Sequence, residues 1–154
     1  MTSAGPSPPG NRSYRPHGCV HTIATTHGAT ALCIITGSTE PATEPGPAPP
    51  SEIIALHELP WVEAGPGVRQ KRIWEEPAGE RRALLARFEP GATLPPHRHV
   101  GDALIFLIEG ANADESGVVA TGNMNYRPHG CVHRVTTQHG ATVLAVVWGR
   151  IEPI

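Results

Sequence analysis

The 154-residue sequence carries little charge and no excess of positive charge. Only 17% of its residues are Asp, Glu, Lys or Arg, and the formal net charge is −2 at pH 7. Lysine occurs once, at Lys71, and the arginines are scattered along the chain rather than clustered. Because nucleic-acid-binding domains show a basic patch or stripe, we expect no nucleic-acid partner.

Long apolar runs and paired cysteines are missing as well. The longest obvious apolar run, residues 143–148, is much shorter than the roughly 20 residues of a membrane-spanning helix, so we expect no membrane partner. Residues 1–11 have neither the basic start nor the apolar stretch of a secretion signal. The three cysteines, Cys19, Cys33 and Cys131, form no CxxC pair and are odd in number. These absences predict a reducing, cytoplasmic location.

Glycine and proline are abundant, with 17 residues of each. Such a content alone would indicate a disordered chain. A hydrophobic fraction of 39% with a charged fraction of 17% is too apolar and too weakly charged for that. Frequent Gly and Pro between short apolar runs predict short strands separated by turns instead.

An internal repeat divides the chain. Residues 10–37 align without gaps on residues 122–149, with 17 identities in 28 positions. About 70 residues of strand-like sequence precede the second copy, whereas nine residues of low complexity precede the first. We interpret residues 10–37 as a partial repeat, the tail of a module whose front half is missing, folded as a hairpin. An isolated hairpin is marginal in water, so we expect it to pack on the edge of the main sheet or on a partner chain.

Four segments follow from these observations. A disordered arm, residues 1–9, precedes the partial repeat at 10–37. Residues 38–51, with the sequence STEPATEPGPAPPS, are typical of an extended Pro-rich linker. The main domain covers residues 52–154.

The main domain is predicted to be all-β. Apolar runs separated by turn residues indicate strands over residues 82–88, 92–94, 103–108, 118–120, 123–127, 131–136 and 141–148. We expect Pro95-Pro96 to end the second of these strands and Glu109-Gly110 to close the third. The last two strands should form a hairpin. Short strands at even spacing indicate a sandwich, a jelly roll or a barrel.

Three of the nine histidines form a candidate metal site. His97 and His99 are two residues apart, so on a strand their side chains point to the same face. Their Cα atoms would lie roughly 6.6 Å apart, which lets both rings reach one ion at about 2.0–2.1 Å. His133 follows a turn at Gly130 and would complete a three-nitrogen set if its strand lies beside or opposite the first.

The spacing of these histidines resembles the two motifs of the cupin superfamily. The first motif, Gly-x5-His-x-His-x3–4-Glu-x6-Gly, is matched by Gly91, His97, His99 and Gly110, with Ala103 at the Glu position. The second motif, Gly-x5-Pro-x-Gly-x2-His-x3-Asn, is matched by Gly122, Pro128, Gly130 and His133, with Thr137 at the Asn position.

The surrounding sequence resembles one branch of that superfamily, which holds ChrR-type cupins and acetylacetone-dioxygenase-like proteins. The similar segments are residues 59–62 (LPWV), residues 66–68 (PGV) and Pro90-Gly91. This resemblance implies an all-β double-stranded β-helix, the jelly-roll cupin barrel, with an N-terminal orphan hairpin. The first repeat copy matches the second motif alone, at Gly10, Pro16, Gly18 and His21. The chain thus resembles a two-cupin protein that has lost the front of its first cupin.

The resemblance implies a mononuclear metal site made by His97, His99 and His133. Because Ala103 cannot bind a metal, the four-ligand version with a glutamate is not available, and open positions remain. Imidazole suits Zn, Cu, Fe and Ni, so the ligands alone do not select a metal; Fe(II) or Zn is favoured. The candidates to lie beside the site are Asp102, which a bulge at Gly101 could rotate inward, His129 in the Pro-x-Gly turn, and Cys131, on the strand face of His133.

The implied function is that of a small Fe(II) dioxygenase acting on a diketone-like or other oxygenated organic substrate. No carboxylate or lysine is an obvious general base, so the chemistry would rest on the metal. The alternative is a non-catalytic Zn-binding sensor or regulatory module resembling the ChrR cupin, although the His-x3-Cys-x2-Cys motif of a full anti-sigma protein is absent. A third interpretation is a degenerate relic of a broken two-domain gene. We expect a homodimer, because Phe106 and Ile108 would face outward from the barrel.

Overall fold

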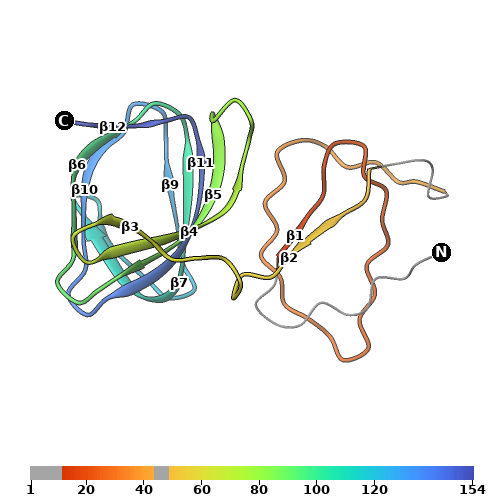
Figure 1. Cartoon of the computed structure of the whole chain (residues 1–154), viewed down its shortest axis with the longest axis horizontal. Helices are drawn as coiled ribbons and strands as arrows, with labels where there is room; N and C mark the ends of the chain where they lie inside the picture. Colours follow the sequence, from red (N-terminus) through yellow and green to blue (C-terminus); the bar gives the residue numbers. More distant parts are fainter. Residues whose placement is uncertain (1–11, 44–48) are drawn as a thin grey trace. The chain divides into compact units, whose positions relative to one another are not determined.

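The structure, a computed structural model, describes residues 12–43 and 49–154 (Figure 1). Within them every regular element is a β-strand, and no helix is long and apolar enough to cross a membrane. The chain divides into two compact units, Met1–Ala55 and Leu56–Ile154. The arm predicted over residues 1–9 and residues 44–48 of the predicted linker lie outside the described residues.

The first unit contains a two-stranded antiparallel sheet. Strand β1 (Arg12–Tyr14) pairs with β2 (Glu52–Ile54), with Ser13 opposite Ile53. An N-terminal strand pair is therefore present, as predicted, but it joins the start of the repeat to residues that follow the linker. Residues 15–37 form no strand and trace an open loop (Figure 1).

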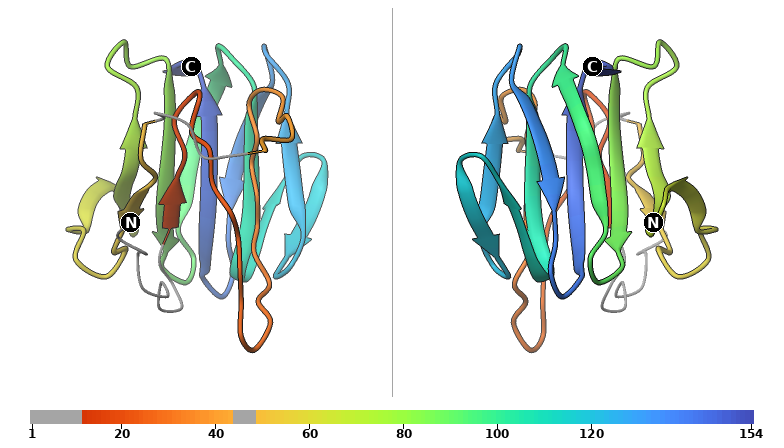
Figure 2. Two further views of the ribbon diagram at one scale, coloured as in Figure 1. Left: turned by 90° about the vertical axis from the view of Figure 1, so that its right-hand side faces the viewer. Right: turned by 90° about the vertical axis from the view of Figure 1, so that its left-hand side faces the viewer.

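The second unit is a curled antiparallel sheet of ten strands. They are β3 (Val62–Gly65), β4 (Val68–Glu75), β5 (Arg81–Phe88), β6 (Thr93–His99), β7 (Ala103–Asp114), β8 (Gly117–Ala120), β9 (Met124–Arg127), β10 (Val132–Thr136), β11 (Ala141–Trp148) and β12 (Ile151–Pro153). Their order is β12-β6-β10-β7-β11-β5-β4-β3, with β8 and β9 paired to β7. Figure 2 shows these strands running side by side, and the predicted all-β fold is confirmed.

Strand β7 is 12 residues long, and its two halves lie in two opposite walls of the barrel. Its first half pairs with β9 and β11, whereas its end pairs with β8 and β10. The prediction that Glu109-Gly110 closes this strand is therefore wrong. Gly110 has a φ of 76° and lies beside a register shift against β11, so the chain bends there without leaving the sheet.

The prediction that Pro95-Pro96 ends a strand is also wrong, because β6 continues through both prolines to His99. The register of β6 against β10 shifts between the pairs Leu94–Val135 and His97–His133. The prolines lie within this bulge, where a missing backbone N–H does not interrupt the ladder.

The predicted hairpin between residues 131–136 and 141–148 does not form. Strand β10 pairs with β6 and β7, whereas β11 pairs with β5 and β7. The two strands therefore belong to opposite walls. Turn residues between them indicate a reversal of the chain, but long-range pairing decides which strands become neighbours.

The second copy of the repeat forms β9, β10 and β11, and each of these strands pairs with β5, β6 or β7. In the described part of the first copy, only Arg12–Tyr14 form a strand, and its partner is β2. This difference explains why nearly the same sequence forms strands in one context and a loop in the other. The interpretation of residues 10–37 as a truncated cupin copy stays a prediction.

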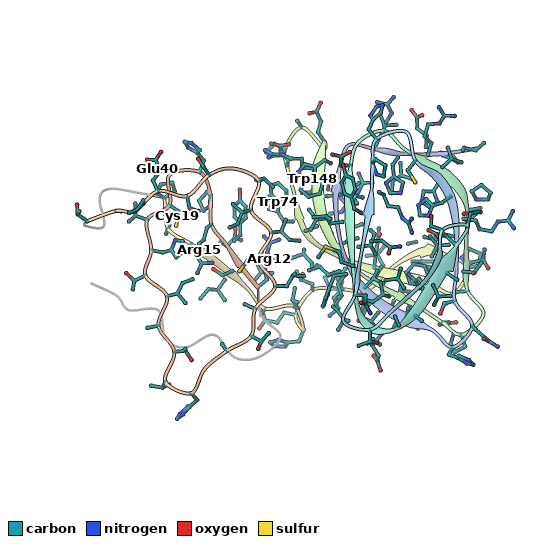
Figure 3. The ribbon with its side chains drawn as sticks, turned by 180° about the vertical axis from the view of Figure 1, so that it is seen from behind. Arg12, Arg15, Cys19, Glu40, Trp74 and Trp148 are labelled. Carbon is teal, nitrogen blue, oxygen red and sulfur yellow. The ribbon has the colours of Figure 1, made fainter. Side chains whose placement is uncertain are left out.

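Side chains alternate between the inside and the outside of the barrel. Leu107 is 1% exposed, whereas its neighbour Ile108 is 45% exposed, so the predicted inward and outward faces of β7 are confirmed. The main buried cluster is formed by Val68, Phe88, Ala92, Leu107, Ala141 and Val143. Trp74 on β4 and Trp148 on β11, labelled in Figure 3, are not part of the lining of the central cavity.

Candidate metal centre

Two neighbouring strands bring the three predicted histidines together. His97 and His99 lie on β6, and His133 lies on β10 directly opposite His97. Alternation along β6 turns both of its histidines inward and leaves Arg98 exposed between them. The exposed fractions of His97, His99 and His133 are only 9%, 3% and 6%.

The three imidazole rings are clustered, with ring centroids 4.4 to 5.2 Å apart. One nitrogen from each ring lies within 4.8 Å of the others, and Nε2 of His99 is 2.9 Å from Nε2 of His133. Nδ1 of His97 is 3.0 Å from the carbonyl oxygen of Pro95. When Nδ1–H donates to that carbonyl, the Nε2 lone pair of His97 is left for a metal.

Burial keeps two of these side chains neutral. The pKa of His99 is lowered to about 4, first by burial and then by the neighbouring His133 and His97. The pKa of His133 is also lowered to about 4, first by burial and then by the charge of Arg127. Since neutral imidazole is the form that binds a metal, both rings are competent ligands at neutral pH.

The donor set fits a transition metal. Three buried imidazole side chains suit Fe(II), Zn, Cu or Ni. Ala103, at the position of the motif glutamate, is fully buried (0% exposed) and offers no ligand atom. Within the described part of the chain, the group that can hold a metal consists of these three histidines. Three protein ligands leave open positions, as in catalytic zinc sites.

A buried ion pair that the sequence did not predict lies beside His133. Asp114, at the end of β7, contacts Arg127, at the end of β9, and their side chains are 2% and 8% exposed. The same Asp114 oxygen, Oδ2, lies 3.4 Å from Nδ1 of His133. Asp114 is therefore placed to orient the His133 ring. No sequence pattern indicates Asp114, because it lies beyond the expected end of its strand.

The three histidines line a cavity of about 420 Å³. Most of the other lining side chains are apolar and come from both walls; among them are Val68, Leu84, Phe88, Leu94, Ile105, Leu107, Val135, Val143 and Val147. The polar exceptions besides the histidines are Gln70, Asn112, Asp114, Asn125 and Arg127. The cavity is thus an apolar chamber with its polar groups gathered on a few strands.

The three other candidate residues do not line this cavity. Oδ1 of Asp102 accepts a hydrogen bond of 2.8 Å from the backbone N–H of His129, so its carboxylate binds the following loop rather than turning inward. Nδ1 of His129 lies 2.9 Å from the carbonyl oxygen of Val100. The carbonyl of Cys131 accepts a hydrogen bond of 2.9 Å from the backbone N–H of His99. These contacts fix the loop before β10 to the end of β6.

A curled antiparallel sheet with two inward histidines on one strand and a third on its neighbour defines a cupin with a potential three-histidine metal site. Residues 50–151 match the family described as ChrR Cupin-like domain, and the chain belongs to this family. No curated protein matches the chain in sequence.

Solved structures show the same fold. A chain in the crystal structure of Rhodobacter sphaeroides SigE in complex with the anti-sigma ChrR is 26% identical to this chain. The match covers 60% of this chain and 51% of that one, with a TM-score of 0.54. A candidate acetylacetone dioxygenase from Methylibium petroleiphilum PM1 is 16% identical over 67% of this chain and 80% of that one, with a TM-score of 0.62. A cupin-like protein from Ralstonia eutropha JMP134 is 24% identical over 54% and 56%, with a TM-score of 0.51. The chain therefore spans about half the length of the first and third of these proteins.

Proposed function

We propose that this chain is a mononuclear metal-dependent enzyme of the Fe(II) dioxygenase type, acting on a small oxygenated organic molecule such as a diketone. The observation that carries the proposal is that His97, His99 and His133 line an otherwise mostly apolar cavity of about 420 Å³. Cavities that bind small molecules measure roughly 300–1,000 Å³. A structural metal site needs no such space and is usually closed by a fourth protein ligand.

The residues around the site have different roles in the proposed reaction. The three histidines hold the ion, which when bound supplies Lewis acidity and one-electron chemistry. Apolar side chains such as Phe88 and Leu107 exclude water from the chamber. Asp114 is occupied by Arg127 and His133, so it is poorly placed to accept a proton from a substrate. The proposal therefore assigns no separate general base.

The test combines metal analysis with oxygen consumption. The protein is purified without added metal, its metal content is measured, and O₂ uptake is followed with a panel of β-diketones. We expect iron and turnover, both lost in His99→Ala. His139→Ala is the matched control, because His139 is an exposed histidine outside the cavity. Iron without O₂ uptake on any substrate of the panel would contradict the diketone assignment, and absence of any metal would contradict the proposal as a whole.

A non-catalytic zinc-binding sensor is the second candidate. It is favoured by the match to the ChrR Cupin-like domain and by the 26% identity to a chain in the SigE–ChrR complex. In that case the purified protein should contain stoichiometric zinc and show no O₂ uptake after reconstitution with Fe(II). The same metal analysis and O₂ electrode experiment therefore separate the two candidates.

A further inference from the structure

The cavity contains a single positively charged side chain among its described lining residues, Arg127. Arg127 is 7% exposed and shares this wall with Asn112, which is 8% exposed. A cation so deeply buried in a mostly apolar chamber is costly unless it is paired and hydrogen-bonded. The groups that pair with Arg127 therefore indicate which kind of ligand the cavity can bind.

Asp114 satisfies only part of the guanidinium group. The contact with Asp114 uses Nη2 of Arg127, whereas the buried Nε of Arg127 has no hydrogen-bond partner in the described part of the chain. The buried Oδ1 of Asn112 is also without a hydrogen-bond partner there. Guanidinium presents several donors in a planar fork, and that fork matches carboxylate geometry. Arg127, which lines the cavity together with the three histidines, thus keeps an unused hydrogen-bond donor.

The charge of the site also favours an anionic ligand. A divalent ion held by three neutral imidazoles brings two positive charges into a buried position, and Ala103 provides no carboxylate to offset them. Asp114 and Arg127 neutralise each other. An anionic ligand would therefore be stabilised by the charge of the ion and by hydrogen bonds from the guanidinium group of Arg127, whereas a cationic ligand would be repelled by the ion.

We propose that the cavity binds a small organic anion whose negatively charged oxygen lies at Arg127 and whose compact apolar body fills the chamber. The proposal rests on the proposed function only in placing this ligand in the same cavity as the metal. A carboxylate and an enolate share the required chemistry. Arg127, Asp114 and Asn125 also line a second hollow of about 260 Å³, so Arg127 is a lining residue of both spaces.

The test is calorimetric titration of the metal-free and the Zn(II)-loaded protein with 3-methylbutanoate and with its neutral counterpart 3-methylbutanamide. We expect the carboxylate to bind at least tenfold more tightly than the amide in both forms. Arg127→Gln should remove this preference, since a charged hydrogen bond contributes about 10- to 100-fold in affinity. Arg98→Gln, the same change at an exposed position on β6, should leave the preference intact.

Arg127→Gln leaves Asp114 buried without its counter-charge and can unfold the protein. The double variant Asp114→Asn/Arg127→Gln keeps a neutral hydrogen-bonding pair and gives a second measurement of the same effect. Acetylacetone, titrated in parallel above pH 9, identifies an enolate ligand if it alone binds with Arg127 dependence. Equal affinity for carboxylate, enolate and amide, or a preference that survives both variants, would overturn the inference.

Two failures are distinguishable in this design. If Zn(II) binds but no anion preference appears, the inference about Arg127 is wrong and the metal-dependent function stands. If no metal binds but the metal-free protein still prefers the carboxylate in an Arg127-dependent manner, the inference stands and the proposed function fails.

Discussion

His97, His99 and His133 have different partners on the nitrogen that faces away from the cluster. Nδ1 of His97 lies near the Pro95 carbonyl, and Nδ1 of His133 lies near Asp114, whereas the buried Nδ1 of His99 has no hydrogen-bond partner among the described residues. Groups that bind the outer nitrogen fix the ring and its tautomer. The orientation of His99 must therefore come from packing and from its contact with Nε2 of His133.

The contact between Asp114 and His133 makes a prediction about metal affinity. Asp114→Asn should weaken metal binding by about 10- to 100-fold, because loss of a carboxylate partner frees a ligating imidazole to rotate. Competition titration with a zinc chelator measures the affinity, and circular dichroism confirms that the variant is folded. Glu109→Gln, an exposed acid on the same strand, is the control. Unchanged zinc affinity in folded Asp114→Asn would exclude this positioning role.

The lowered pKa values of His99 and His133 predict a pH dependence of stability in the metal-free protein. Both pKa values are about 4 in the folded protein, against an ordinary value of 6.5. Below pH 6.5 the unfolded chain therefore binds more protons than the folded one, and the free energy of unfolding falls as pH decreases toward 4. Each histidine contributes up to about 1.4 kcal/mol per pH unit in this window.

Urea denaturation of the metal-free protein at pH 7.5, 6 and 5 measures this dependence. The double variant His99→Gln/His133→Gln should show a flatter profile over the same range. A free energy of unfolding that is constant or that rises between pH 6.5 and 5 would contradict the assignment of both histidines as buried and neutral.

Among the elements, β6 shows what sequence patterns predict well and what they miss. Alternation along His97-Arg98-His99 correctly predicted two histidines on one face, because side-chain direction in a strand is a local property. The Pro95-Pro96 pair predicts a strand end, since proline lacks a backbone N–H to donate to the ladder. A bulge absorbs both prolines, and bulges depend on the partner strand, here β10.

Strand β7 also depends on its partner strands, which explains why Asp114 was not predicted. The apolar run over residues 103–108 is a local signal, but the second half of the strand contains Gly110 and polar residues. Its pairing with β8 and β10 comes from residues later in the chain. The histidines were predictable from spacing, whereas the ion pair between Asp114 and Arg127 depends on where two strands end in space.

The end of β11 makes a prediction at Gly101. A Cβ atom at Gly101 would overlap the backbone carbonyl of Trp148, and backbone atoms cannot rotate away as a side chain does. Gly101→Ala should therefore lower the free energy of unfolding by about 1–3 kcal/mol or more. Gly37→Ala is the control, because a Cβ there meets no atom within 4 Å. Equal denaturation midpoints for Gly101→Ala and the wild-type protein would contradict this packing.

At the scale of the whole molecule, the homodimer stays a prediction, and we propose that the outer face of the barrel forms its interface. Phe106 on β7 lies between Met124 on β9 and Leu144 on β11 in the strand register, and Ile108 follows on the same strand face with 45% exposure. We predict that light scattering gives a mass of about twice the 16.3 kDa of one chain. Ile108→Glu should shift this mass to that of the monomer, because a buried unpaired carboxylate destabilises an interface. A monomeric wild-type protein at high micromolar concentration would contradict this prediction.

The central claim is that the three histidines form a metal site with open positions. Titration of metal-free protein with Co(II), followed by visible absorption, tests it most directly, since both stoichiometry and ligand environment are read in one experiment. We predict one ion per chain, with binding abolished in His97→Ala, His99→Ala and His133→Ala and retained in His139→Ala. Absence of Co(II) binding by the folded protein, or binding that survives the loss of His99, would contradict the account.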